Sequence, residues 1–210
     1  MKLLIYRIAK FFIWLYLHAI FRFQVRGRDN IPGQGGVLLA ANHVSAYDPP
    51  VVGCVIPRPA FFLAKKELFD NPLKKLVMTL VRCIPVDRAD IGHATLRRIN
   101  SLLKRNEAIL LFPEGTRSRS GQMSSGKDGV GMIAAHNNVD VVPVHVAGLY
   151  KVRGSIFRRP RITITFGKPV AVSRLLAEAQ ASSRERYRMV SAAVFERIRE
   201  LGNGARVPAS

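Results

Sequence analysis

The sequence predicts an α/β protein whose mixed, partly parallel central sheet is flanked by helices. Two observations lead to this prediction. Between residues 26 and 202, short apolar runs alternate with segments of helical periodicity, which is the pattern of a sheet covered by helices. No internal repeat, low-complexity tract or Gly/Ser-rich linker divides this region, so it is predicted to form one domain.

The first half of this domain is predicted to contain three strands and one helix. Residues 36–41 (GVLLAA) and 60–64 (AFFLA) are continuous apolar runs, as in buried strands. Residues 71–82 have a helical pattern, and Pro72 falls in the first turn, where a missing backbone N–H is tolerated. Residues 83–86 form a further short strand.

The second half begins with a helix predicted over residues 90–104, with Asp90 as its N-cap. Three strands are predicted after it, at residues 108–112, 139–146 and 161–166. The last of them alternates polar and apolar residues, so we expect it nearer the edge of the sheet. The final helix is predicted over residues 173–201, because apolar residues recur on one helical face, at Val190, Val194, Ile198 and Leu201.

Residues 1–25 are apolar and aromatic, with basic residues between them. The longest run without a charge, residues 11–21, is shorter than the roughly 20 residues that span a bilayer. A secretory signal is disfavoured because no small-residue cleavage site follows. A spanning anchor would need Arg7 and Lys10 to snorkel toward the headgroups. A helix lying in the membrane interface needs no such arrangement, and ordinary core packing is a third alternative.

The sheet domain is therefore predicted to be preceded by an N-terminal membrane-associated helix. The predicted organisation is a helical segment over residues 1–25, the α/β domain over residues 26–202, and a frayed tail over residues 203–210.

The net charge of +19 is compatible with nucleic acid, an anionic membrane surface or phosphorylated substrates as partners. The usual motifs of nucleic-acid-binding modules are missing from the sequence, so no nucleic-acid partner is predicted. The two cysteines, Cys54 and Cys83, lie in apolar stretches without zinc-like spacing. We interpret them as small buried residues in a reducing, cytosol-facing compartment, and we predict no metal site.

The segment after the first predicted strand has a pattern that suits proton transfer. Histidine is the side chain best suited to exchange protons near neutral pH, and Asp48 follows His43 by five residues. If the chain turns between them, Asp48 can hold one ring nitrogen of His43 while the other faces a substrate. A loop histidine beside a helix-capping aspartate is the alternative, since this spacing alone is common.

A second polar segment follows the predicted strand at residues 108–112. Glu114, Gly115, Arg117 and Arg119 come directly after it, which is typical of a ligand site at the carboxyl end of a strand. An arginine can bind a phosphate through two hydrogen bonds, and glycine allows a close backbone approach. A solvated loop with incidental charges is the alternative.

Together these segments resemble the conserved blocks of the glycerolipid acyltransferase family. The first and third blocks resemble Asn42-His43-x-Ser45-x-x-Asp48-Pro49 and Phe112-Pro113-Glu114-Gly115-Thr116-Arg117-Ser118. The stretch Ala64-Lys65-Lys66-Glu67-Leu68, the second block Ile84-Pro85-Val86-Asp87-Arg88 and the fourth block Val142-Pro143-Val144 also match in order. The similarity covers about residues 25 to 168, and its best-matching branch acylates 1-acyl-glycerol-3-phosphate.

The resemblance implies a role for each matching residue. His43 would be the general base and Asp48 its orienting partner. The substrate-binding residues that it implies, with Arg117 on the acceptor's phosphate, are Lys65, Arg88, Glu114, Gly115, Thr116 and Arg117. Pro143 lies in the block associated with the pocket of the acyl donor. His93, His136 and His145 match no block, and Gly126 departs from the phenylalanine that family members commonly have before the lysine, here Lys127.

The reaction implied is transfer of an acyl group from acyl-CoA or acyl carrier protein to the sn-2 hydroxyl of lysophosphatidic acid, giving phosphatidic acid. Acylation of glycerol-3-phosphate or another lysophospholipid is the alternative. The acyl donor is a co-substrate, and the family uses no cofactor and no metal. The expected partners are this donor, lysophosphatidic acid and the membrane phospholipid surface. The expected location is the cytoplasmic face of the cell membrane, as a monotopic or peripheral protein.

Overall fold

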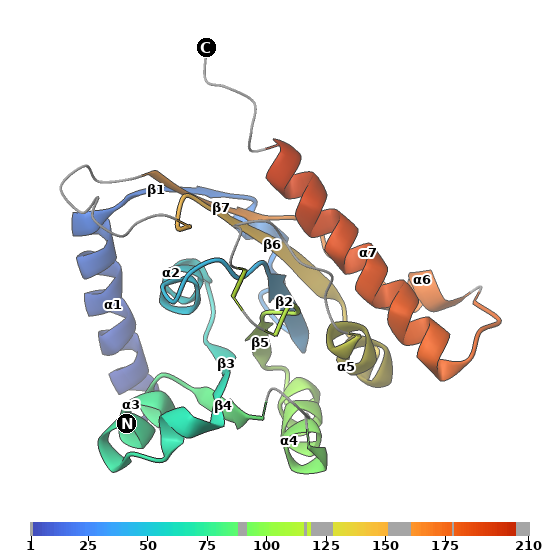
Figure 1. Ribbon diagram of the computed structural model, residues 1–210, viewed down its shortest axis with the longest axis horizontal. Helices are drawn as coiled ribbons and strands as arrows, with labels where there is room; N and C mark the ends of the chain where they lie inside the picture. The colour runs from blue at the N-terminus through green and yellow to red at the C-terminus, as the bar shows by residue number, and fades with distance from the viewer. Residues whose placement is uncertain are drawn as a thin grey trace.

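A seven-stranded sheet lies between two layers of helices in the computed structural model (Figure 1). The structure describes residues 2–87, 92–115, 117–118, 128–150, 161–177 and 179–204. The strands in spatial order are β1 (Arg22–Arg26), β7 (Arg161–Phe166), β6 (Val141–Ala147), β2 (Val37–Ala41), β5 (Ala108–Leu111), β3 (Ala60–Lys65) and β4 (Cys83–Val86).

All neighbouring strands are parallel except β6 and β7, which pair antiparallel. The five strands β6, β2, β5, β3 and β4 consequently run in one direction, and β1 and β7 run in the other. Their five carboxyl ends meet at one edge of the sheet. The mixed, partly parallel sheet predicted from the sequence is confirmed.

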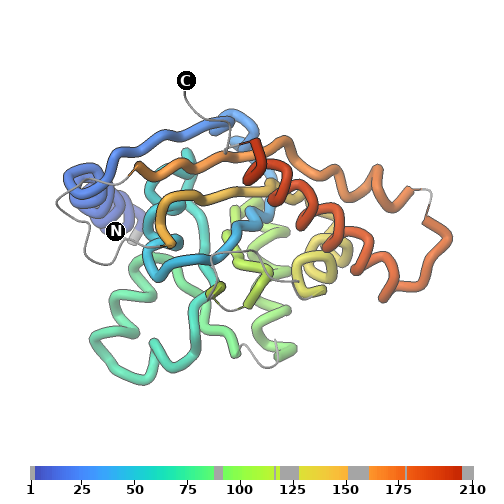
Figure 2. The backbone as a smooth tube through the Cα atoms, turned by 45° about the horizontal axis from the view of Figure 1, so that its top comes forward, coloured from blue at the N-terminus to red at the C-terminus, as the bar shows by residue number. Residues whose placement is uncertain are grey.

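Helices cover both faces of the sheet. One face is covered by α1 (Lys2–Ile20) and α2 (Asp48–Val55), and the other by α4 (His93–Lys104), α5 (Gly129–Asn137), α6 (Val172–Ala177) and α7 (Ser183–Gly204). The tube in Figure 2 shows the first and last helices, α1 and α7, far apart on either side of the strands. The remaining elements are the short 3-10 helices η1 (Arg28–Asn30) and η2 (Lys66–Phe69) and the helix α3 (Pro72–Leu80).

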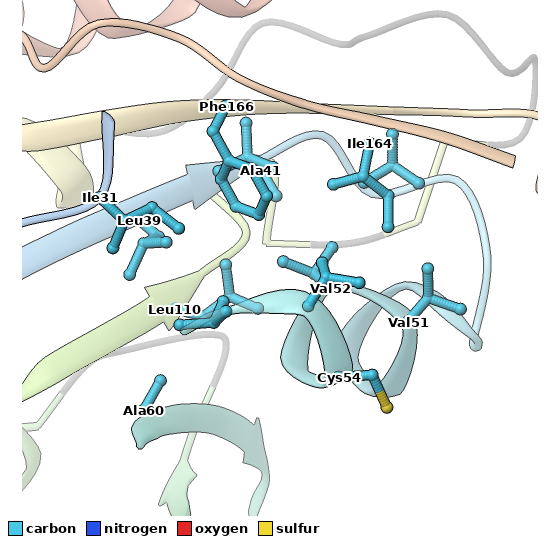
Figure 3. Packing of buried hydrophobic residues seen from close by; sticks show 14 of the residues in the cluster. Ile31, Leu39, Ala41, Val51, Val52, Cys54, Ala60, Leu110, Ile164 and Phe166 are labelled. Carbon is cyan, nitrogen blue, oxygen red and sulfur yellow. The ribbon is translucent and has the colours of Figure 1, made fainter. Parts of the chain in front are cut away.

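Strand β2 lies in the middle of the sheet and is buried on both faces. Leu39 and Ala41 belong to the core cluster under α1 and α2, which Figure 3 shows with Val52 of α2 packed nearby. Leu38 and Ala40 belong to the second cluster, under α4, α5 and α7. Every residue of β2 is buried, which explains why its sequence is apolar without alternation.

The predicted strands all form, with ends shifted by at most two residues, but several helices differ from prediction. Helix α4 begins at His93 with Gly92 as N-cap, so the start predicted at residue 90 is wrong; Asp90 itself lies outside the described residues. The predicted final helix is two helices, α6 and α7. Helix α7 continues to Gly204, into the predicted tail.

Among the strands and α-helices of the described residues, β1, α2 and α5 were not predicted. The first four residues of β1 belong to the segment predicted as helical, residues 1–25. The strand alternates polar and apolar residues at the sheet edge and pairs with β7. Helix α2 begins at Asp48, and Pro49 and Pro50 occupy its first turn.

The packing of α5 on α7 requires a glycine at position 131. A Cβ atom there would lie 1.9 Å from the backbone oxygen of Tyr187, and the Gly131 N–H donates a hydrogen bond to Ser191 Oγ at 3.1 Å. The two helices therefore approach closely at this point, and no side chain fits between their backbones.

We predict that Gly131→Ala lowers the free energy of unfolding by about 1–3 kcal/mol, although alanine is normally the better helix former. The reason is that the backbone of α7 must move. Urea denaturation of the variant and the wild type measures the effect. Gly33→Ala is the matched control, because a Cβ atom at Gly33 meets no atom within 4 Å. Equal stability of Gly131→Ala and wild type would show that α5 and α7 can accommodate a Cβ atom at position 131, which would contradict the prediction.

Candidate active site

The polar residues of the site lie at the carboxyl edge of the sheet. His43 follows the end of β2 by two residues, and Asp48 is the first residue of α2, so the two flank the turn that joins these elements. Both side chains are buried: His43 is 6% exposed and Asp48 is 0% exposed. Burial of two ionisable groups at a strand end is unusual without a specific role or partner.

One oxygen of Asp48 holds the turn together. Asp48 Oδ2 accepts hydrogen bonds from His43 Nδ1 at 2.8 Å, from the Val44 backbone N–H at 2.7 Å and from the Ser45 backbone N–H at 2.8 Å. All three donors come from the five residues before Asp48. The five-residue spacing therefore bends the chain around the carboxylate, and the expected His43–Asp48 hydrogen bond is present.

This arrangement assigns the tautomer of His43. An ionised carboxylate can only accept hydrogen bonds, as Asp48 Oδ2 does from the two backbone N–H groups, so in this contact His43 Nδ1 carries the hydrogen. In the neutral imidazole the other nitrogen, Nε2, then has a free lone pair. The ring is thus oriented to take up a proton at Nε2.

The main chain of His43 is held from the opposite side by the loop after β5. Glu114 Oε1 accepts a hydrogen bond from the His43 backbone N–H at 2.9 Å, and the Ser118 backbone N–H donates to the His43 carbonyl oxygen at 2.8 Å. Glu114 is itself only 5% exposed. Gly115 makes the turn between these residues possible, because its φ of 70° is in the left-handed region.

Two further residues, Phe112 and Asn42, support His43 in roles that were not predicted from the sequence. The ring of Phe112 stacks on the imidazole at a centroid distance of 4.3 Å. The Asn42 side chain pairs with Val146 of β6, donating to its carbonyl oxygen at 3.0 Å and accepting from its N–H at 2.7 Å. Asn42 thereby extends the β2–β6 pairing up to the residue before His43. The position of Asn42 directly before His43 in the motif could have indicated this role from the sequence. The stacking of Phe112 on His43 could not, because it depends on the three-dimensional structure.

A cavity of about 560 Å³ opens beside His43. Its wall near the strand ends includes Leu63, Val86 and Leu111, and α5 and α7 contribute Met132, Arg184 and Tyr187. This size and mostly apolar lining are typical of a site for a small ligand or an acyl chain. His93 also lines the cavity, while His136 is exposed and His145 packs against Gly202.

The predicted phosphate ligands lie at different distances from His43. Arg117 is exposed and immediately precedes Ser118, which contacts His43. Lys65 ends β3, two strands from β2 and therefore about 10 Å across the sheet. It forms an exposed ion pair with Glu67 at 2.8 Å. Arg88 and Thr116 lie outside the described residues.

Pro143, which the resemblance assigns to the block of the acyl donor, lies away from the wall of the cavity beside His43. It lies inside β6, paired with Ala40, and its ring faces Gly167. The described residues that line the cavity beside His43 do not include it. Its assignment to the donor pocket stays a prediction.

The two thiols lie in apolar surroundings. Burial raises the pKa of the Cys54 and Cys83 thiols to about 11. Both groups are therefore protonated at neutral pH and are poor nucleophiles. Neither is among the described residues lining the cavity, so the geometry does not favour a cysteine acyl intermediate.

Comparison with known proteins identifies the family. The profile of the family described as "Acyltransferase" matches residues 22–147, which include the site around His43. The chain belongs to this acyltransferase family.

Individual relatives in this family carry a more specific name. The 1-acyl-sn-glycerol-3-phosphate acyltransferase of Bacillus subtilis is 28% identical over 181 residues, covering 86% of this chain and 88% of that protein. The protein of the same name from Streptococcus pneumoniae is 30% identical over 148 residues, covering 69% of this chain and 54% of that protein. The chain thus matches only about half the length of some of its relatives.

A solved structure supports the fold of this acyltransferase. The crystal structure of the 1-acyl-sn-glycerophosphate (LPA) acyltransferase PlsC from Thermotoga maritima matches with a TM-score of 0.76 and 24% identity. The match covers 98% of this chain and 81% of that one.

Proposed function

We propose that this acyltransferase transfers an acyl group from a thioester donor to the sn-2 hydroxyl of lysophosphatidic acid, giving phosphatidic acid. The observation that carries the proposal is the hydrogen bond between His43 Nδ1 and Asp48 Oδ2, which leaves Nε2 as the basic nitrogen of a residue lining the cavity. The relatives named as 1-acyl-sn-glycerol-3-phosphate acyltransferases support this choice of acceptor.

In the proposed mechanism, His43 Nε2 takes the proton of the sn-2 hydroxyl as its oxygen attacks the thioester carbonyl carbon. Asp48 stabilises the imidazolium that forms, because the Nδ1–H already points at its carboxylate. The tetrahedral intermediate collapses, the C–S bond breaks, and the imidazolium returns the proton to the departing sulfur. No group of the protein becomes acylated, in agreement with the protonated state of both thiols.

The surroundings of His43 suit both the apolar acyl chain and the anionic phosphate group of the proposed substrates. The apolar wall of the cavity would take an acyl chain, whose burial is favourable by about 0.8 kcal/mol per methylene. Arg117 lies on the exposed side of the same loop, where a guanidinium can bind the acceptor's phosphate through two hydrogen bonds. Lys65 would contribute to the same anionic region from the end of β3. Acyl-CoA and acyl carrier protein are both suitable donors.

We further propose that the protein is monotopic and lies on the cytoplasmic face of the membrane, with α1 in the interface. Residues 3–20 of α1 have a mean hydropathy of 1.5, and only 11% of this stretch is buried, so by length and composition it could also span a bilayer. The side of α1 opposite its packed side is apolar as well, and it exposes Leu4, Phe11, Phe12 and Leu15 by 50–61%.

The attachment of α1 supports the interfacial arrangement over a spanning one. Tyr6, Lys10 and Leu17 recur at helical spacing on the side that packs on the domain. Lys10 Nζ donates a hydrogen bond to the carbonyl oxygen of Ile56, the C-cap of α2, so Lys10 points into the domain and not to the headgroups. Two residues after α1, β1 enters the sheet. The helix is thus held along its length against the domain.

We predict that His43→Ala lowers kcat about 10²–10⁴-fold, which is the usual contribution of a general base. The purified protein is assayed in detergent micelles with lysophosphatidic acid, glycerol-3-phosphate and other lysophospholipids as acceptors, each with acyl-CoA and acyl carrier protein donors. Lysophosphatidic acid should be the best acceptor. Near-normal turnover of the variant would exclude His43 as the base, and preference for another acceptor would overturn the proposed substrate.

A second prediction concerns the acceptor's phosphate. Loss of a charge-assisted hydrogen bond costs about 1.5–3 kcal/mol, so Arg117→Ala should raise the KM for lysophosphatidic acid about 10- to 100-fold while kcat changes little. Arg186→Ala is the control, since it removes the same charge from an exposed position on α7. Equal KM values for the two variants would show that Arg117 does not bind the acceptor.

A further inference from the structure

Helix α3 carries an apolar stripe that the rest of the domain leaves exposed. Leu73, Leu76 and Val77 are spaced as neighbours on one helical face, and they are 70%, 56% and 44% exposed. Leu68 of the preceding η2 adds a fourth apolar side chain, 39% exposed. None of the residues of α3 is buried, so its apolar side chains contribute little to the core.

The helix is nevertheless well formed at its start. The Asn71 side chain is its N-cap, and Asn71 Oδ1 accepts hydrogen bonds from the backbone N–H groups of Leu73 and Lys74 at 3.0 and 3.1 Å. Pro72 occupies the first turn, where its fixed φ favours a helix. The apolar stripe is therefore presented on a preformed helix, which reduces the entropy lost when it binds a partner.

Basic residues surround the stripe. Lys65, Lys66, Lys74 and Lys75 are all exposed, and they lie in η2, in α3 or just before them. Two exposed carboxylates, Glu67 and Asp70, lie in the same segment, and Glu67 pairs with Lys65, so four lysines against two carboxylates leave a net charge of +2. A cluster of exposed leucines flanked by lysines on a helix is the pattern of an element that lies in the interface of an anionic membrane. The overall charge of +19 favours the same partner.

Helix α3 lies near α1, and it follows the strand end at the edge of the sheet that carries His43. Helix α3 contacts α1, and Figures 1 and 2 show it beside the N-terminal end of that helix. Its chain leaves the sheet at the carboxyl end of β3, which is the edge that carries His43. The apolar surfaces of α1 and α3 thus lie on neighbouring helices, and the second is close to the carboxyl edge.

We propose that η2 and α3 form a second membrane-docking element, which inserts the side chains of Leu68, Leu73, Leu76 and Val77 into an anionic leaflet. This inference rests on the proposed interfacial position of α1. One helix can rotate about its own axis on a membrane, whereas two contacts at an angle fix the orientation of the domain. The carboxyl edge with His43 then faces the leaflet from which the acceptor comes.

A single tryptophan can test this insertion directly. The chain has one tryptophan, Trp14, in α1. The double variant Trp14→Phe/Leu76→Trp moves the fluorophore from α1 to α3. The double variant Trp14→Phe/Met189→Trp is the control, because Met189 is 39% exposed on α7. Each protein is mixed with vesicles of phosphatidylcholine and phosphatidylglycerol, with and without brominated acyl chains.

The proposal expects a blue-shifted emission and quenching by brominated lipid for the α3 tryptophan, and neither change for the α7 control. Quenching of Trp14 in the wild type together with an unquenched α3 tryptophan would overturn the α3 contact and leave the position of α1 intact. No quenching at either position would overturn both membrane contacts. Acyl transfer measured in detergent micelles reports the enzymatic proposal separately, because it does not depend on vesicle binding.

A variant that lacks the apolar stripe of α3 tests the same membrane contact by vesicle binding. Leu73→Gln/Leu76→Gln should weaken binding to the same vesicles about 10-fold or more, since it removes two exposed apolar side chains that the leaflet would bury. Its activity in detergent micelles should equal that of the wild type, which also shows that the variant is folded. Met189→Gln should bind like the wild type. Unchanged vesicle binding of the double variant would contradict the proposal.

Discussion

The hydrogen bonds to Asp48 Oδ2 are the interaction on which the site depends. The carboxylate is fully buried, and removing such a group from water costs several kcal/mol. Three donors within the preceding turn offset this cost, at about 1.5–3 kcal/mol for each hydrogen bond to a charged group. The same three bonds bend the chain after β2, begin α2 at Asp48 and direct the His43 ring. Fold and chemistry therefore depend on the same oxygen atom.

The parallel strands convert this local turn into a site. Because β2 and β5 are neighbours, the loop after β5 reaches the main chain of His43, and Glu114 and Ser118 hold its N–H and its carbonyl group. The end of β3 brings Lys65 to the same edge and then leads into α3. The proposed substrate-binding residues and the proposed lipid-facing helix α3 are thus arranged by one property of the sheet, the common direction of its central strands.

Sequence patterns predicted the central strands and the His43–Asp48 pair, because an uninterrupted apolar run and a short motif are local features. They did not predict β1, which is a strand only because β7 lies beside it. Helix α2 was missed because its two prolines suit a turn and a helix start equally well. The stacking of Phe112 on His43 and the inward direction of Lys10 depend on distant parts of the chain, so no local pattern could indicate them.

The tautomer of His43 is the property through which Asp48 would control the reaction. Long-range ¹H–¹⁵N NMR spectra of the imidazole rings, recorded on ¹⁵N-histidine-labelled protein, measure it directly. The chain has five histidines, and the spectrum of His43→Gln identifies the signals of His43 by their loss. The hydrogen bond to Asp48 predicts that the neutral form of the ring carries its hydrogen on Nδ1 and leaves Nε2 unprotonated. A ring with its hydrogen on Nε2 would contradict it, because that nitrogen could not then accept the proton of the acceptor hydroxyl.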